Sequence, residues 1–222
     1  MLEKRRYNLD ELAAYLRVNT PAKDAKKLRA AIAKKLEKYN VEFTVSGREE
    51  NTTFEITQIQ DPLKVFFVFE MDISPQTDFT KFEYFFYLVL NDDGMTGMNA
   101  KMVEEYLRSK PINITRQTIS KYIKKIIKSE MLYLDSECVY YRVNTNHVGQ
   151  THEIVSREEY SKAWKIYWNC CEKGMDSLAA YHTMYDAFGG VPRKYPIMVT
   201  NAFFKDEVDW ISEQLCDKFE RE

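Results

Sequence analysis

The sequence has few of the residues from which disulfide frameworks, zinc sites and nucleophilic active sites are built. Its 222 residues include 4 cysteines, at positions 138, 170, 171 and 216, and 3 histidines. The cysteines show no CxxC spacing and the histidines no HxH or HExxH spacing, so neither a disulfide framework nor a zinc site is predicted. No serine elbow, kinase signature or paired catalytic carboxylate motif is present. We therefore predict a protein that is not an enzyme and that holds no metal or cofactor.

An export signal and long apolar runs are also lacking. No apolar stretch follows the basic N-terminal residues, and the longest apolar run, residues 82–90, contains Glu83 and is too short to span a bilayer. Together with the absence of a disulfide pattern, this predicts a soluble cytoplasmic protein without membrane contact. The apolar share of 45%, with 13 Phe and 15 Tyr, is ample for folded cores.

Positive charge is scarce overall but concentrated in two segments. The net charge is −2, yet residues 1–40 carry 11 Lys and Arg against 5 Asp and Glu. Residues 101–130 carry 8 basic against 3 acidic side chains, whereas residues 41–100 carry 3 against 11. Local field rather than net charge governs binding to polyanions, so a nucleic acid is a plausible partner.

Residues 1–73 are predicted to form a first module of two helices and a hairpin. Residues 22–39 place apolar side chains every three or four positions, which is typical of one face of a helix. Residues 41–46 and 52–59 alternate on either side of a polar turn, as a hairpin would, and residues 63–73 are expected to add a third strand. The polar face of the second helix carries Lys23, Lys26, Lys27, Lys34 and Lys38.

Residues 79–145 are predicted to form a second module. Residues 79–91 are almost wholly apolar and predict a buried helix, and Asn99 is placed to cap the helix that follows. Thr115 is expected to cap a third helix that runs to residue 131. Residues 132–143 alternate around a polar tripeptide at 135–137, which favours a hairpin.

Residues 114–132, ITRQTISKYIKKIIKSEML, resemble the recognition helix and following wing strand of bacterial winged helix-turn-helix proteins. The resemblance covers residues 79–143 and rests on the order of a buried helix, a short helix, a tight turn, a capped helix and a hairpin. In that family the third helix lies in the major groove. The resemblance implies that the residues nearest to base edges are Arg116, Gln117, Thr118, Ser120 and Lys121.

The helical period alone points to the same face. A stripe through Ile119, Tyr122 and Ile126 is apolar, so the lysines must project from the opposite side. Arg and Gln can read base edges with paired hydrogen bonds, and lysines can contact phosphates. The alternative is a lysine face that is merely solvated. The predicted DNA-binding residues are Thr115, Arg116, Gln117, Thr118, Ser120, Lys121, Lys124, Lys125 and Lys128, with Lys23, Lys26, Lys27 and Lys34 of the first module.

Residues 152–222 are predicted to be a helical region of different character. A capping box at residues 156–159 opens one helix, a second spans residues 175–188, and a last amphipathic helix covers residues 203–219 after an extended stretch at 191–199. Tyr160, Trp164 and Trp168, spaced by four, favour a core or a dimer seam over a ligand cage. A homodimer through these helices is therefore a candidate assembly.

The predicted fold class is thus mainly α with small antiparallel hairpins (α+β), with tandem winged-helix modules and a C-terminal helical region. The function that fits best is sequence-specific binding of double-stranded DNA, of the transcription-regulator type, in a bacterium, phage or plasmid. A plasmid or phage replication initiator and a winged-helix protein-interaction module are the alternatives. A nicking enzyme is disfavoured, because its metal needs a histidine pair that is missing. The target sequence and any effector stay open.

Overall fold

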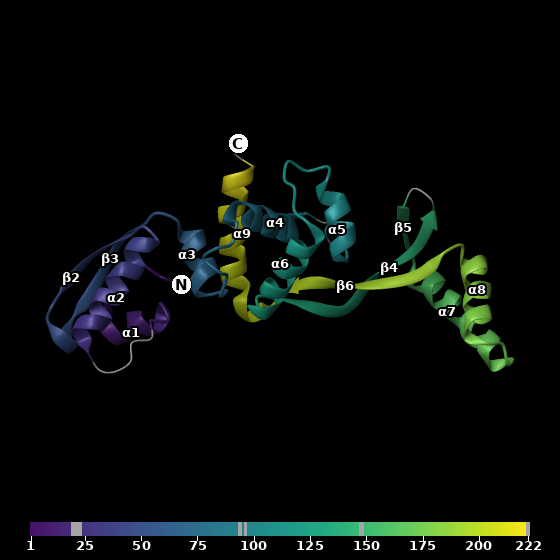
Figure 1. Ribbon diagram of the computed structural model, residues 1–222, viewed down its shortest axis with the longest axis horizontal. Coiled ribbons are helices and arrows are strands. Elements are labelled where there is room, and N and C mark those ends of the chain that lie inside the picture. The colour runs from purple at the N-terminus through teal and green to yellow at the C-terminus, as the bar shows by residue number, and fades with distance from the viewer. Residues whose placement is uncertain (19–23, 93–94, 96, 147–148, 221–222) are drawn as a thin grey trace. The chain divides into compact units, whose positions relative to one another are not determined.

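The computed structural model of the chain describes residues 1–18, 24–92, 95, 97–146 and 149–220 and is drawn in Figure 1. These residues form nine α-helices and two three-stranded antiparallel sheets, which confirms the α+β class. None of the described helices combines the length and the apolar content that crossing a bilayer requires. The chain divides into two compact units. Unit 1 comprises Met1–Phe86, Lys121–Met131 and Asp206–Glu222, and unit 2 comprises Tyr87–Ser120 and Leu132–Lys205.

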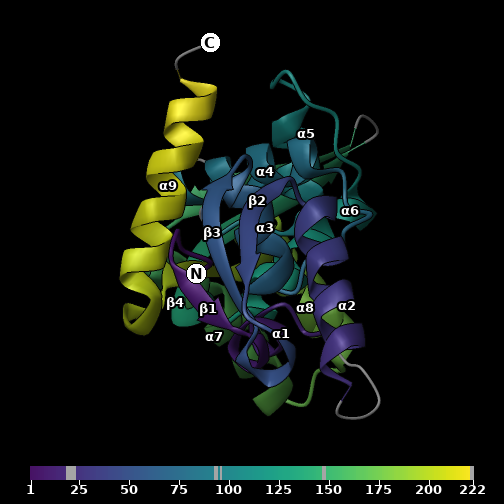
Figure 2. The same ribbon diagram turned by 90° about the vertical axis from the view of Figure 1, so that its left-hand side faces the viewer.

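Unit 1 begins with a small antiparallel sheet and two helices. Its elements are β1 (Arg6–Asn8), α1 (Leu9–Tyr15), α2 (Ala25–Lys38), β2 (Val41–Ser46) and β3 (Thr53–Ile59). The strands lie side by side in the order β1-β3-β2, with α1 and α2 next to them (Figure 2). Leu12, Leu36 and Phe54 are buried in one core that both helices share with the sheet. The predicted helices and hairpin are therefore present, and the short strand β1 is an addition.

Local sequence signals set the ends of these elements. Asn8 and Asp24 cap α1 and α2, each accepting a backbone N–H of the first turn, at 2.8 and 3.2 Å. The sequence Asn19-Thr20-Pro21, which predicts a break between the two helices, lies outside the described residues. The hairpin turns at Gly47, where φ is +81° and a Cβ would come within 2.1 Å of the Asn51 carbonyl oxygen. Only glycine fits this turn without a rearrangement of the backbone.

The third strand predicted for residues 63–73 is wrong, because this stretch contains helix α3 (Pro62–Phe69). Asp61 caps the helix by accepting the backbone N–H of Lys64 at 3.0 Å, and the proline takes the first turn, where no N–H is needed. A continuous apolar run does not distinguish a buried strand from a buried helix. Here the Asp-Pro pair decides in favour of the helix.

Helix α3 joins two cores of unit 1, because it is apolar on all sides. Val65, Val68 and Phe69 pack into the core of the sheet. The rings of Phe66 and Phe67 lie 5.5 and 5.1 Å from those of Trp210 and Phe82. The second core is completed by parts of α4 (Phe79–Asn91), α6 (Arg116–Lys128) and α9 (Lys205–Phe219).

Unit 2 contains the second sheet, in the strand order β5-β4-β6. Its strands are β4 (Leu132–Asn146), β5 (Gly149–Val155) and β6 (Val191–Thr200). The hairpin predicted within residues 132–143 is wrong, since β4 continues through the polar tripeptide at 135–137 and pairs with β6 on both sides of it. The tripeptide coincides with a register shift between Leu134 and Cys138, so it forms an irregularity of the strand and no turn.

Three helices complete unit 2: α5 (Ala100–Leu107), α7 (Arg157–Glu172) and α8 (Ser177–Phe188). Asn99 caps α5, and Ser156 and Glu159 form the predicted capping box at the start of α7. Gly189, with φ of +74°, ends α8 in the left-handed conformation. Of the 16 residues of α7, Ala163 is the one that is fully buried, so this helix hairpin has a thin core.

Candidate nucleic-acid interface

The basic face of α2 is exposed to solvent. Ile32 and Leu36 are buried on the opposite side of the helix. Lys27 is 3.3 Å from the carboxylate of Asp24. The other exposed cations of this face of α2 have no carboxylate within ion-pair distance among the described residues. Lys23 lies outside the described residues. The exposed cations of this face are Lys26, Lys27, Arg29, Lys34 and Lys38.

Lys35 of α2 has a different role from its neighbours. Its Nζ donates to the carbonyl oxygen of Leu16 at 2.5 Å and lies 5.3 Å from the centre of the Phe69 ring. Burial lowers the pKa of Lys35, and the nearby charges of Lys38 and Arg17 lower it further. Lys35 therefore ties α2 to the end of α1, at Leu16, the residue before Arg17.

The predicted recognition helix exists as α6, and its N-terminal turn is exposed. Arg116 and Gln117 point to solvent, while Ile119 and Ile126 are fully buried. The Thr118 N–H donates to the Thr115 hydroxyl at 3.4 Å, so Thr115 is a cap as predicted. The remaining predicted residues divide into exposed side chains, Lys121, Lys124 and Lys128, and half-buried ones, Thr118, Ser120 and Lys125.

A carboxylate already occupies the start of α6. Glu104 Oε1 accepts the backbone N–H of Arg116 at 2.8 Å. A negative group at a helix N-terminus is stabilised by the helix dipole, so this backbone position is satisfied within the protein. Contacts to a ligand are therefore left to the side chains of Arg116 and Gln117.

Asp72 contacts the cations at the C-terminal end of the lysine face of α6. Its carboxylate lies 2.8 Å from Arg17 Nη1 and 3.1 Å from Lys128 Nζ, and its carbonyl oxygen accepts from Lys125 Nζ at 3.1 Å. The hydrogen bond from Lys128, followed by the charges of the neighbouring cations, holds the pKa of Asp72 below its ordinary value. Lys125 and Lys128 are thus partly neutralised, whereas Lys121 and Lys124 have no carboxylate partner among the described residues.

A cavity of about 380 Å³ opens beside these lysines. Ile73, Phe82 and Tyr122 provide apolar side chains, and Ser74 and Thr77 provide hydroxyl groups. The four lysines of α6 line it as well, namely Lys121, Lys124, Lys125 and Lys128. The cavity was not predicted, because its lining joins segments about fifty residues apart in sequence.

Comparison with known proteins gives no family for this chain. No family model, no curated protein and no solved structure matches it. Within the described part of the chain, no group of three or more His, Cys, Asp and Glu side chains is placed to hold a metal ion. The function is therefore argued from the charge and geometry of the surface itself.

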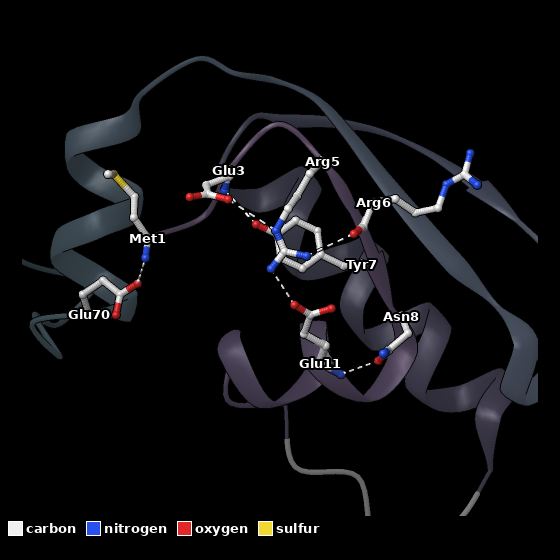
Figure 3. A network of polar contacts seen from close by, with 8 residues as sticks. All are labelled: Met1, Glu3, Arg5, Arg6, Tyr7, Asn8, Glu11 and Glu70. Atoms are coloured by element: carbon white, nitrogen blue, oxygen red, sulfur yellow. Dashed lines mark hydrogen bonds and ion pairs between the residues drawn. The ribbon is translucent and has the colours of Figure 1, made fainter.

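Arg5 and the terminal amine belong to a network of polar contacts near the start of the chain, which Figure 3 shows. Arg5 donates to Glu11 at 2.5 Å and stacks 3.8 Å from the centre of the Tyr7 ring. Arg6 lies 3.6 Å from Glu55, and the terminal amine lies 2.9 Å from Glu70. These cations are balanced by carboxylates, so we do not include them in the interface.

The aromatic side chains of α7 and α8 line a separate hollow of about 440 Å³ in unit 2. Trp168 and Leu178 are 57% and 65% exposed, which is unusual for such large apolar side chains. The indole nitrogen of Trp164 is buried and has no hydrogen-bond partner among the described residues. The hollow is lined by Trp164, Tyr167, Trp168, Ser177, Leu178 and Tyr181.

Proposed function

We propose that this chain binds double-stranded DNA through the basic side chains of α2, Arg17 and α6. The observation that carries the proposal is a continuous run of positive charge in unit 1. Arg17 follows Leu16, whose carbonyl oxygen accepts from Lys35 of α2, and it shares Asp72 with Lys128 of α6. Cations that are mostly without carboxylate partners fit the closely spaced phosphates of a duplex.

The two ends of α6 support different contributions to DNA binding. Arg116 and Gln117, exposed in its first turn, are chemically able to read guanine and adenine edges in the major groove. Lys121 and Lys124 follow on the same helix and suit phosphates, which add affinity without sequence information. We therefore propose sequence-specific binding of the transcription-regulator type, with origin binding by a replication initiator as the close variant.

The N-terminal module gives the better support for a winged arrangement. Its hairpin β2–β3 directly follows the basic helix α2, in the order of helix, helix and hairpin. The hairpin expected within residues 132–143 is absent, because β4 runs straight through the predicted turn and pairs with β5 only from Tyr140 onward. On this proposal α2 contacts the groove with the β2–β3 hairpin as a wing beside it.

We also propose that the α7–α8 hairpin pairs with a second copy of itself. The patch holds both a hollow and protruding side chains, Trp168 and Leu178, so two copies related by a two-fold axis are self-complementary.

The proposal is tested by fluorescence anisotropy with a pool of genomic duplexes, followed by selection of the bound sequences. The variant Lys121→Gln/Lys124→Gln and the variant Lys26→Gln/Lys34→Gln each remove two exposed positive charges. The matched control, Lys162→Gln/Lys165→Gln, removes the same charge from α7, outside the interface. We expect the slope of log K against log salt to fall by about 2 for each interface variant, because each lost phosphate contact contributes about 0.9.

The outcome that contradicts the proposal is equal loss of affinity in the control and in both interface variants. Specificity is tested separately with Arg116→Ala, which is expected to relax the selected sequence and to cost about 1–3 kcal/mol on the best site. An unchanged sequence preference in this variant would remove Arg116 from base recognition.

A further inference from the structure

The cavity beside α6 combines apolar walls with a positive rim. Ile73, Phe82 and Tyr122 are each less than 8% exposed, so the inner side is apolar and sheltered. Ser74 and Thr77 lie at the opening and supply hydroxyl groups. A volume of about 380 Å³ lies within the range of small-molecule sites, which run from roughly 300 to 1,000 Å³.

The charge at the rim has a definite sign and is only partly compensated. The four lysines occur at positions i, i+3, i+4 and i+7 of α6, so they share one side of the helix. Asp72 engages Lys125 and Lys128. Lys121 and Lys124 have no acidic partner in the parts of the chain that the structure describes. Two ammonium groups are thus available to a ligand that also contacts the apolar wall.

We propose that this cavity binds a small amphipathic organic anion, with an aromatic or aliphatic body and a carboxylate or sulfonate head. The body lies against Ile73, Phe82 and the aliphatic stems of the lysines, because these provide the apolar lining. The head accepts hydrogen bonds from Lys121 and Lys124, since charged donors make the stronger bonds. A neutral molecule of the same shape leaves both ammonium groups unpaired and binds less tightly.

The same lysines belong to the DNA surface, so the anion and the duplex compete for them. This regulatory consequence rests on the proposed function, whereas the binding site itself does not. Occupation of the cavity removes two phosphate contacts and lowers affinity for DNA. The site thereby gives the protein a way to respond to the concentration of an organic acid.

The test uses 1-anilinonaphthalene-8-sulfonate, whose fluorescence rises in apolar surroundings, and N-phenyl-1-naphthylamine, which has the same rings without the sulfonate. We expect the sulfonate to bind the full chain at one high-affinity site and the neutral amine to bind roughly tenfold more weakly, the loss of a charged hydrogen bond. Lys121→Gln/Lys124→Gln is expected to weaken the sulfonate about tenfold or more, and Lys162→Gln/Lys165→Gln to leave it unchanged. Circular dichroism checks that each variant is folded.

A second pair of variants separates this cavity from the aromatic hollow of unit 2. Trp168→Ser/Leu178→Ser removes the exposed apolar side chains of α7 and α8 and is expected to leave sulfonate binding intact. Thr77→Trp fills the opening of the cavity and is expected to abolish it. Loss of binding in the first variant, or equal binding of the charged and neutral probes, overturns the proposal.

Failure of this inference can be distinguished from failure of the DNA proposal. Sulfonate binding that depends on Lys121 and Lys124, in a protein that binds no duplex, upholds the cavity and removes DNA as its competitor. Lysine-dependent DNA binding in a protein that does not bind the sulfonate overturns the cavity alone. When both are present, the sulfonate is expected to displace a labelled duplex from the wild type, and Thr77→Trp is expected to resist displacement.

Discussion

Two adjacent lysines show how burial divides side chains of the same type between stability and binding. Lys34 projects into solvent without a carboxylate partner in the described chain, whereas Lys35 donates to the Leu16 carbonyl and lies over Phe69. The first is available to a phosphate, and the second holds α2 to the end of α1. The helical period predicted the lysine face but did not show this difference, because it depends on contacts outside the helix.

Substitutions at these two positions are expected to change different properties, stability at Lys35 and DNA affinity at Lys34. Lys35→Met keeps the aliphatic stem and loses the hydrogen bond, so the free energy of unfolding should fall by about 1 kcal/mol. Lys34→Met should change it by less than about 0.5 kcal/mol and should instead weaken DNA binding. Urea unfolding and anisotropy titrations of both variants measure the two effects. The same stability loss in both would contradict the assignment of Lys35 as a structural residue.

Asp72 is the residue whose replacement should strengthen binding. It accepts from Arg17 and Lys128, and its φ of +55° lies in the left-handed region, where asparagine is tolerated as well as aspartate. Asp72→Asn keeps the shape and removes the negative charge. We expect DNA affinity to rise and the salt slope to increase by about 1, as the released cations reach phosphates.

The pH dependence of the Asp72 contact follows from its lowered pKa. The ion pairs are intact above the pKa of an unfolded aspartate, about 3.9, and are lost as the pH falls through the lower pKa of the folded state. Affinity measured from pH 8 to pH 5 should therefore show no step due to Asp72. A rise in affinity of the wild type within that range, absent in Asp72→Asn, would show that Asp72 titrates higher than the structure implies.

At the scale of elements, single helices with a clear period were predictable and paired strands were less so. The apolar stripe through Ile119 and Ile126 gave α6 its buried face, and Asn99 and Ser156 marked the starts of α5 and α7. Residues 132–143 were interpreted as a hairpin because they alternate. Their central tripeptide, Asp-Ser-Glu, lacks the Gly or Asn that tight hairpin turns favour, which argued against a turn.

The α3 helix was the other element predicted wrongly, although a local signal was present. Asp61-Pro62 is an N-cap followed by a proline in the first turn, and the apolar run after it fits a helix buried on all sides. The basic faces of the candidate interface were predictable from period and charge. Asp72 and the cavity were not, because they bring residues near position 73 to α6 through tertiary contacts.

Helices α4 and α9 are joined by an ion pair that is buried on one side. Glu83 is 1% exposed and lies 2.6 Å from Lys218 Nζ, and burial raises the pKa of its carboxyl despite that partner. Lys218→Met removes the partner and leaves the carboxylate in an apolar site. Because Lys218 is itself about half exposed, we expect a loss of about 1–3 kcal/mol near neutral pH, below the usual cost of breaking a fully buried pair.

The direction in which pH changes the stability loss of Lys218→Met shows whether the loss comes from the charge of Glu83. A carboxyl whose pKa is raised on folding favours the folded state when protonated, so its unfavourable effect grows as the pH rises through the folded pKa. The deficit of Lys218→Met should therefore shrink as the pH falls from 7 towards the ordinary pKa of glutamate, about 4.3. Glu83→Gln/Lys218→Met should recover most of the stability at pH 7, as measured by thermal unfolding. A deficit independent of pH would point to lost packing of the lysine stem instead.

At the scale of the molecule, opposite charges are separated while the net charge stays near zero. A net charge of −2 coexists with the basic side chains of α2 and α6, so the proposed DNA binding would rest on local contacts and not on long-range attraction. Such binding is steeply sensitive to salt, since each contact releases counterions. A total charge near zero therefore does not exclude a polyanionic partner.

The proposed assembly is tested by sedimentation of the full chain. We expect the wild type to be a dimer and Trp168→Asp/Leu178→Asp to be a monomer, because two charges in the apolar patch oppose its burial. Phe203→Asp is the matched control, since Phe203 is 92% exposed and lies outside the patch. A wild-type monomer, or a dimer that survives the double substitution, would rule out this surface as the seam.

Unit 1 is built from segments that are far apart in the sequence, and this affects how the protein folds during translation. Its second core needs Trp210 against Phe66 and Phe219 against Tyr84, and these partners are translated more than a hundred residues apart. On the ribosome, the sheet and its two helices emerge early, while the aromatic side of α3 must wait for α9 before it is covered. A premature stop before residue 205 would accordingly leave a nascent chain with a bare aromatic surface, the kind of polypeptide that chaperones retain and proteases remove.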